Sequence, residues 1–321
     1  MPTSTDEDFA SRTASYRPDL LAHCYRMLGS VHEADDLVQE TMLRAWRAWD
    51  RYDAKRASVR TWLHRIATNA CLTALEGRAR RPLPSGLGPP NDDPSTPLVP
   101  DMEVPWLQPF PDARLADPAS HVVDRSSLRL ALVATMQLLP PRQRAVLVLR
   151  ESLGFSAAEV ADALGTSRAA VDSALHRARA TLSAAGVSSE EEVDEPPDAE
   201  VREVVERYAR AFERADVNGL VALLTDDAVL EMPPVPLWYR GRADYGRFME
   251  RVFAMRGDDW RMRLTSANGQ PALAAYCAED GDRRLHTLQV LTVGRGGVGR
   301  NVVFADPRVF AAFDLPTLLD G

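Results

Sequence analysis

Proline is the residue that most constrains the fold of this chain. Eleven of its 23 prolines fall between Pro82 and Asp124. Proline fixes φ and lacks a backbone N–H group, so it continues neither a helix nor a central strand. Residues 82–124 are therefore expected to form an extended, polyproline-like connector. A connector at this point divides the 321 residues into separate folded parts. A chain of this length is expected to form roughly two or three domains.

The segment before the connector has helical periodicity throughout. One helix is predicted over Arg17–Leu28, and a second begins at Ser30, which forms a capping-box pattern with Glu33. Apolar residues then recur at i, i+3, i+4 and i+7, as on the buried face of an amphipathic helix. A third helix is predicted over Val59–Arg81, where Pro82 stops it.

Residues 125–186 resume the helical pattern and contain a helix-turn-helix spacing. A second capping box, Ser156-Ala157-Ala158-Glu159, precedes Ala161, Gly165 and Val171. In this motif the alanine allows close helix packing, the glycine makes the turn and the valine anchors the second helix. An ordinary helical hairpin is the alternative, but a polar, largely basic face on the second helix favours DNA binding in a major groove. That face comprises Arg168, Asp172, Ser173, His176, Arg177 and Arg179.

The remainder of the chain belongs to a different structural class. An acidic linker over residues 187–198 precedes a segment, 199–315, that alternates helices with strand-like runs. Asp280-Gly281 is a hairpin turn signal between two of these runs. The pattern predicts an α+β domain with a curved antiparallel sheet.

Charge is unevenly distributed along the chain. The net charge is −8, yet residues 1–90 carry +2 and residues 125–186 carry +4. Residues 91–124 and 187–321 carry −6 and −8. Basic helical segments that alternate with acidic ones favour a nucleic-acid partner.

A basic surface is concentrated on the third predicted helix. Between residues 54 and 81 only one acid, Glu76, accompanies seven basic residues, and Trp62, His64 and Asn69 are interleaved with them. Such a surface suits single-stranded DNA with unstacked bases, although Trp62 and Ile66 at i, i+4 are better interpreted as core. The basic residues are Lys55, Arg56, Arg60, Arg65, Arg78, Arg80 and Arg81.

Cysteine usage and hydropathy bear on the compartment. Cys24, Cys71 and Cys277 lie far apart without a CxxC pair, which argues against a disulfide framework or a metal centre. No apolar run approaches the ~18 residues of a membrane span, and the acidic N-terminal segment is unlike a signal peptide. We expect a cytoplasmic protein with no membrane segment, metal or cofactor.

Three motifs, in order, carry a resemblance to a known family. They are Ala34-Asp35-Asp36-Leu37-Val38-Gln39-Glu40-Thr41, Trp62-Leu63-His64-Arg65-Ile66-Ala67-Thr68-Asn69 and the helix-turn-helix over 156–182. Together they resemble the extracytoplasmic-function group of bacterial RNA polymerase sigma factors. Residues 199–315 resemble the SnoaL-like α+β cone that some of these factors carry as a fused extension.

The resemblance implies a multidomain, promoter-directing factor that binds core RNA polymerase and promoter DNA and is not an enzyme. Residues 12–81 would be sigma region 2 and residues 125–186 sigma region 4. The implied polymerase-binding residues are Asp35, Asp36, Gln39 and Glu40. His64, Ile66 and Asn69 match the family's positions around the pocket for a flipped minus-ten base. The basic residues expected to contact the minus-ten element beside them are Arg56, Arg60, Arg65, Arg80 and Arg81. The helix with Arg177 would read the minus-thirty-five element. Asp172 and Ala174 stand where many members have basic residues, so the promoter sequence does not transfer.

The connector and the C-terminal part suggest regulation. Trp106, Leu107 and Phe110 would be unusual as exposed apolar groups, so they are expected to form a docking element. We hypothesise that the cone packs against the first two domains and holds them in a spacing unsuited to the promoter, and that an unidentified small molecule in its cavity shifts this balance.

Two alternatives stay open at this stage. One is a helix-turn-helix regulator that acts without polymerase, which leaves residues 12–81 unexplained. The other is a bifunctional protein with a catalytic cone, because titratable groups could line its cavity. Those groups are Asp226, Glu231, Trp238, Tyr239 and His286.

Overall fold

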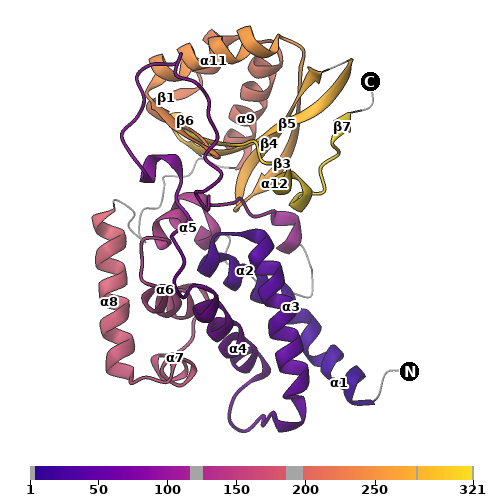
Figure 1. Ribbon diagram of the computed structural model, residues 1–321, viewed down its shortest axis with the longest axis vertical. Coiled ribbons are helices and arrows are strands. Elements are labelled where there is room, and N and C mark those ends of the chain that lie inside the picture. The colour runs from indigo at the N-terminus through magenta and orange to yellow at the C-terminus, as the bar shows by residue number, and fades with distance from the viewer. Residues whose placement is uncertain (1–3, 116–125, 186–197, 280, 320–321) are drawn as a thin grey trace. The chain divides into compact units, whose positions relative to one another are not determined.

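Two compact units make up the computed structural model, which describes residues 4–115, 126–185, 198–279 and 281–319 (Figure 1). The first unit contains the described residues up to Arg81 and from Gln108 to Ala185. The second contains Pro82–Leu107 and the described residues from Asp198 onward. Of the linker predicted at 187–198, only Asp198 lies within the described residues, and a helix begins there.

Four helices form the N-terminal part of the first unit: α1 (Ser4–Thr13), α2 (Arg17–Leu28), α3 (Val31–Arg47) and α4 (Val59–Ala74). Gly29 ends α2 with a φ of 68°, in the left-handed region that glycine adopts without strain. Ser30 caps α3 by accepting a hydrogen bond from the Glu33 amide. The predicted apolar face of α3 is buried, which confirms the helical periodicity.

Helix α4 ends seven residues earlier than the sequence predicts. Pro82 is the expected stop signal, but α4 ends at Ala74, and Gly77 follows with a φ of 70°. A left-handed glycine breaks the helix before the proline is reached. Arg78 and Arg81 consequently leave the helix, and both form ion pairs with Glu33, at 2.9 and 2.8 Å.

The helix-turn-helix prediction is confirmed in the second part of this unit. Helices α5 (Leu130–Met136) and α6 (Pro141–Leu147) precede α7 (Ala157–Leu164) and α8 (Arg168–Ala184). The Ser156–Glu159 capping box is complete, and Gly165 ends α7 with a φ of 61°. The buried face of α8 consists of Val171, Leu175, Ala178 and Leu182.

The two helical parts of the first unit share one interior. The Arg144 side chain on α6 is 3% exposed and donates hydrogen bonds to the Met27 carbonyl oxygen at the end of α2 and to Gln137 Oε1. Burial lowers the pKa of Arg144 to about 10, so the guanidinium stays charged at neutral pH. Arg26 on α2 similarly donates to the Ser127 hydroxyl at 2.6 Å.

The second unit is built on a mixed, open sheet. The strand order is β2-β1-β6-β5-β4-β3, with β7 paired to β5. All pairs are antiparallel, as predicted, except β1 and β6, which run parallel with Leu230 opposite Asn301. The elements are α9 (Asp198–Glu213), α10 (Val217–Val221), β1 (Leu224–Met232), β2 (Val235–Arg240), α11 (Arg242–Arg256), β3 (Trp260–Ala267), β4 (Gln270–Glu279), β5 (Asp282–Gly294), β6 (Gly297–Phe304), α12 (Pro307–Ala312) and β7 (Leu318–Leu319).

The connector is anchored to the second unit over Pro82–Leu107. The Asn91 amide donates to the Trp238 carbonyl oxygen at 2.8 Å, and the Trp238 indole donates to the Gly88 carbonyl oxygen at 2.9 Å. Asp101 donates its amide proton to the Pro234 carbonyl oxygen at 2.9 Å. These contacts give an otherwise irregular, proline-rich segment one fixed path.

The predicted apolar docking residues of the connector are all buried. Trp106 and Leu107 are 9% and 0% exposed and belong to the second unit. Phe110 is 0% exposed and belongs to the first unit, where its ring lies 4.9 Å from that of Tyr25 on α2. The segment is therefore divided between the two units.

Candidate DNA, polymerase and ligand sites

Helix α8 presents an open face of the kind that enters a major groove. The six predicted residues of this face, including Arg168 and Arg177, are all exposed. Ser167 caps the helix by accepting a hydrogen bond from the Ala170 amide. Arg179 forms an ion pair with Glu151 at 2.6 Å, so it is oriented by a neighbour in the same helical region.

The predicted minus-ten face of α4 is divided between open and covered residues. Arg65 and Asn69 are exposed on α4, Ile66 is half-buried, and Arg56 and Arg80 are exposed outside it. His64 is fully buried: its Nδ1 lies 2.9 Å from the Arg60 carbonyl oxygen, and its ring is 5.5 Å from that of Phe155. A buried His64 reaches no DNA base in this arrangement.

Arg60 is engaged by the segment that leads into the helix-turn-helix. Its guanidinium donates to the Leu153 carbonyl oxygen at 2.8 Å and lies 4.7 Å from the centre of the Phe155 ring. The second contact is a cation–π interaction. No local sequence pattern indicates these contacts, because they join residues more than 90 positions apart.

An acidic edge of α7 faces this part of α4 across a polar cleft of about 460 Å³. Arg56 and Arg65 line one side, and Glu159 and Asp162 line the other. The Thr61 hydroxyl donates to Glu159 Oε1 at 3.3 Å. The Ser156 amide, and to a smaller extent Arg60, hold the pKa of Glu159 below its usual range. Two acidic side chains of α7 therefore line the same cleft as Arg56 and Arg65.

The predicted polymerase-binding residues lie on α3. Asp36 and Gln39 are exposed. Asp35 forms an ion pair with Arg114, and Glu40 forms one with Arg44. Asp36 and Gln39 are thus the open positions of this surface.

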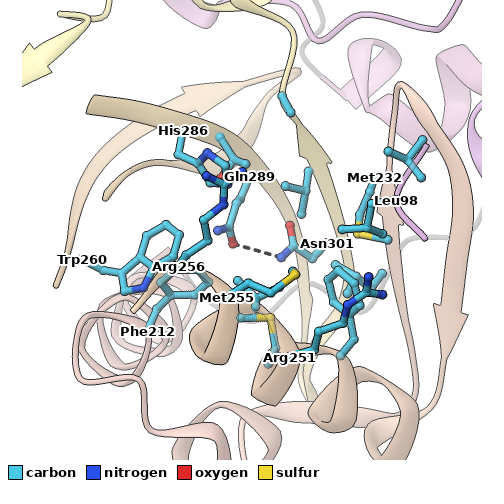
Figure 2. A pocket seen from close by; sticks show the side chains of 18 of the residues that line it. Leu98, Phe212, Met232, Arg251, Met255, Arg256, Trp260, His286, Gln289 and Asn301 are labelled. Carbon is cyan, nitrogen blue, oxygen red and sulfur yellow. Dashed lines mark hydrogen bonds between the residues drawn. The ribbon is translucent and has the colours of Figure 1, made fainter. Parts of the chain in front are cut away.

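A cavity of about 590 Å³ opens in the second unit between α11 and the sheet (Figure 2). Of the five residues expected to line such a cavity, only His286 lines it. Glu231 is buried elsewhere, where it pairs with Arg300 and accepts the Ser85 amide, and Asp226 is exposed beside Arg242. Burial lowers the pKa of His286 to about 4, so the imidazole is neutral at physiological pH.

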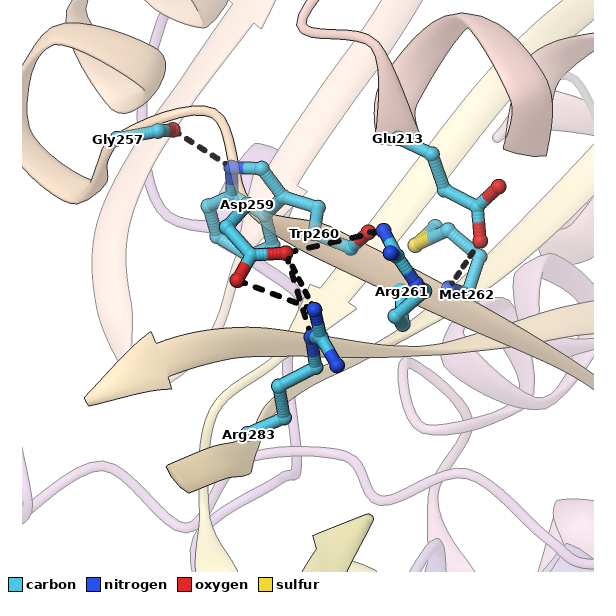
Figure 3. Close-up of polar contacts among 7 residues, drawn as sticks. All are labelled: Glu213, Gly257, Asp259, Trp260, Arg261, Met262 and Arg283. Carbon is cyan, nitrogen blue, oxygen red and sulfur yellow. Dashed lines mark hydrogen bonds and ion pairs between the residues drawn. The ribbon is translucent and has the colours of Figure 1, made fainter. Parts of the chain in front are cut away.

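Polar contacts fix the Trp260 wall of this cavity (Figure 3). The Trp260 indole donates to the Gly257 carbonyl oxygen at 2.8 Å. Asp259, just before β3, pairs with Arg283 at 3.0 Å, and the Met262 amide within β3 donates to Glu213 at 2.8 Å. These contacts hold the strand, and with it the indole, at the cavity edge.

In the part of the chain that the structure describes, no group of three or more His, Cys, Asp or Glu side chains is arranged to hold a metal ion. No helix there is both long and apolar enough to cross a membrane. Cys24, Cys71 and Cys277 are free and buried, as expected for small core residues.

An open, largely basic face on the second helix of a complete helix-turn-helix is the arrangement typical of DNA-binding transcription proteins. The sequence matches the sigma-70 region 2 family over residues 13–81, the sigma-70 region 4 family over 129–182 and the SnoaL-like domain family over 205–312. It is 49% identical over 315 residues to the ECF RNA polymerase sigma factor SigG of Mycobacterium tuberculosis, covering 97% of this chain and 85% of that protein.

A second relative is the ECF RNA polymerase sigma factor SigJ of the same organism, at 30% identity over 79% of this chain and 71% of that protein. The crystal structure of SigJ shares the fold, with a TM-score of 0.64 and 24% identity over 96% of this chain and all of that one. The chain belongs to the ECF RNA polymerase sigma factors. As such it binds core RNA polymerase and directs transcription initiation at promoter DNA, and it is not an enzyme.

Proposed function

We propose that three surfaces of this sigma factor divide the work of initiation. Asp35, Asp36, Gln39 and Glu40 on α3 bind core polymerase, and the α8 face reads the minus-thirty-five element. Region 2 binds the minus-ten element through Arg56, Arg60, His64, Arg65, Ile66, Asn69, Arg80 and Arg81. The observation that carries this assignment is the open basic face of α8 on a complete helix-turn-helix.

We further propose that the first unit represents the resting state of the free protein. Arg60 is bonded to Leu153, His64 is covered by Phe155 and Thr61 is bonded to Glu159. Promoter DNA would compete for the same side chains, so region 4 must leave region 2 before the minus-ten element binds. Core polymerase, by binding both regions, would supply the free energy for this opening.

The C-terminal domain regulates this step in our proposal. It holds the connector that joins regions 2 and 4, and it offers a cavity large enough for a small molecule. A domain that restrains the connector restricts the separation of the two regions. The site of action is the cytoplasm, where polymerase and promoter DNA are found.

Reconstituted transcription tests the proposal. The purified chain with core polymerase should produce run-off transcripts from its cognate promoter, and a chain ending after about residue 198 should produce more if the C-terminal domain inhibits. Fewer transcripts from the shortened chain would instead indicate an activating contact. Tight binding to duplex promoter DNA without any dependence on core polymerase would favour a helix-turn-helix regulator and contradict the assignment.

A further inference from the structure

We propose that the cavity of the second unit binds an amphipathic carboxylate, whose apolar body fills the cavity while its carboxylate is held by Arg256 at the cavity edge. The proposal rests on the regulatory role given above and names the class of ligand. Its binding test uses neither polymerase nor DNA, so it succeeds or fails independently of the promoter assignment.

The cavity wall is positively charged, although the part of the chain that forms most of it is acidic. Arg251 and Arg256 line the cavity, and no described Asp or Glu side chain does. The Arg251 guanidinium donates to the Pro94 and Thr96 carbonyl oxygens of the connector, which are neutral groups, so its charge is not cancelled there. Residues 187–321 carry a net charge of −8. Their carboxylates are thus kept off this wall, which favours an anionic ligand.

Arg256 is the arginine that is open to a ligand. It is the last residue of α11 and is exposed, and its guanidinium forms no ion pair or hydrogen bond with any described residue. Two acids in its neighbourhood are engaged elsewhere: Asp259 pairs with Arg283 at 3.0 Å, and Glu279 pairs with Arg284 at 3.9 Å. The planar fork of N–H donors on a guanidinium matches the two oxygens of a carboxylate.

His286 supplies a second polar group at the same place. Figure 2 shows the Arg256 side chain extending from α11 toward His286 on β5. Burial, and after it the charge of Arg256, lower the pKa of His286 to about 4, in agreement with a guanidinium close to the imidazole. His286 is half-buried, lines the cavity and forms no hydrogen bond with a described residue. A neutral imidazole carries one N–H donor, so it can add a hydrogen bond to a carboxylate held by Arg256.

The rest of the wall selects an apolar body. The cavity of about 590 Å³ lies within the range of roughly 300–1,000 Å³ that holds drug-sized molecules. In Figure 2, Leu98 and Met232 lie on the side of the cavity opposite Trp260 and His286. Because Arg256 is exposed, a carboxylate there keeps part of its hydration while the body leaves water. The apolar wall residues include Leu98, Phe212, Leu230, Met232, Val252 and Val303.

Matched pyrene probes test the ligand class with the full chain. In a fluorescence titration we expect pyrenebutyrate to bind about tenfold more tightly than pyrenebutanol, the neutral alcohol of the same skeleton, as one hydrogen-bonded contact to a charged group allows. A carboxylate loses more hydration than an alcohol on entering an apolar site, so an apolar wall alone would give the opposite preference. Equal affinities, or tighter binding of the alcohol, would overturn the proposal.

Charge-matched variants assign the contact to Arg256. Arg256→Gln should weaken the binding of pyrenebutyrate about tenfold and leave that of pyrenebutanol unchanged. Arg207→Gln removes the same charge from an exposed position of α9 that does not line the cavity, and it should leave both affinities unchanged. An equal loss in Arg207→Gln would mean that net charge attracts the probe, and an unchanged affinity in Arg256→Gln would place the carboxylate elsewhere. Either result would overturn the proposal.

A third variant locates the apolar body. Val252 lines the cavity from α11, so Val252→Trp should weaken the binding of both probes at least about tenfold, because the indole takes the volume that pyrene would fill. Undiminished binding to Val252→Trp with a wild-type thermal unfolding transition would place pyrene outside the cavity and would overturn the proposal. If Val252→Trp fails to fold, Arg256→Gln still decides, since it alters an exposed side chain.

Discussion

The guanidinium of Arg60 donates a hydrogen bond of 2.8 Å to the carbonyl oxygen of Leu153. One residue lies on the region 2 helix proposed to bind the minus-ten element, and the other lies just before the region 4 helix-turn-helix. This bond, with the Phe155 ring stacked on the same guanidinium, connects the two DNA-binding regions in the free protein. The predictions below follow from that connection and from the surfaces around it.

Neutralising Glu159 should favour the open form. Glu159→Gln keeps the capping-box geometry, since glutamine also serves at that position, but removes the charge that faces Arg60. We expect the free protein to bind a single-stranded minus-ten oligonucleotide about threefold more tightly in an anisotropy titration, a change of ~0.6 kcal/mol and within the range of exposed ion pairs. Glu203→Gln on the exposed face of α9 is the control. If Glu159→Gln binds the oligonucleotide with wild-type affinity, Glu159 does not compete with DNA for Arg60.

The two DNA-binding surfaces should respond differently to loss of an arginine. Arg177→Ala should cost ~1–3 kcal/mol if Arg177 contacts a base in bidentate fashion, and should relax specificity at one promoter position. Arg80→Ala should weaken binding to all sequences alike and reduce its salt dependence, as loss of a phosphate contact does. Binding measurements with core polymerase on single-position promoter variants at several salt concentrations separate these outcomes. A sequence-independent effect of Arg177→Ala would contradict base reading.

Asn69 is an exposed residue of α4 in the free protein, so its contribution can be isolated. Asn69→Ala should slow promoter opening while leaving binding to duplex DNA intact, because the proposed contact is to an unstacked base. Comparing duplex and pre-melted promoters measures this. Equal losses on both templates would mean that Asn69 contacts no flipped base.

The polymerase-binding surface should be separable from folding. Asp36→Arg reverses a charge on the exposed side of α3 and should weaken association with core polymerase about tenfold, with no change in thermal unfolding. Glu203→Arg, again on α9, serves as the matched reversal. If Asp36→Arg retains wild-type affinity for core polymerase in a pull-down, this α3 surface is exposed to solvent and does not bind polymerase.

Acid should destabilise the C-terminal domain through His286. The pKa of this residue is about 4 in the folded chain and about 6.5 when unfolded, so between these values the unfolded state binds more protons. The stabilising contribution of neutral His286 is therefore complete above pH 6.5 and is lost as the pH falls toward 4. His286→Gln should reduce this slope in the thermal unfolding of the full chain followed by tryptophan fluorescence, and an identical slope would assign the acid sensitivity to other groups.

Local patterns were sufficient to predict the elements that carry most of the function. The buried face of α8 follows from apolar spacing, and the turn before α8 follows from Gly165, which ends α7. One error has a local cause: Gly77 ends α4 before Pro82 does.

Contacts between distant segments were beyond a single sequence. The burial of His64 depends on Phe155, about 90 residues away, and the pairing of β1 with β6 decides that Asn301 rather than Glu231 lines the cavity. The sequence identified Trp106, Leu107 and Phe110 as residues that must be buried. It gave no indication that they would be divided between two units.

A reversible crosslink tests most directly whether region 4 must leave region 2 for initiation. Thr61→Cys and Glu159→Cys, joined by a short reducible thiol crosslinker, would hold the two regions together, while native Cys24, Cys71 and Cys277 are buried and protected from the reagent. With core polymerase and the cognate promoter, the crosslinked chain should give no run-off transcript, and reduction should restore transcription. Equal transcription before and after reduction would contradict the account.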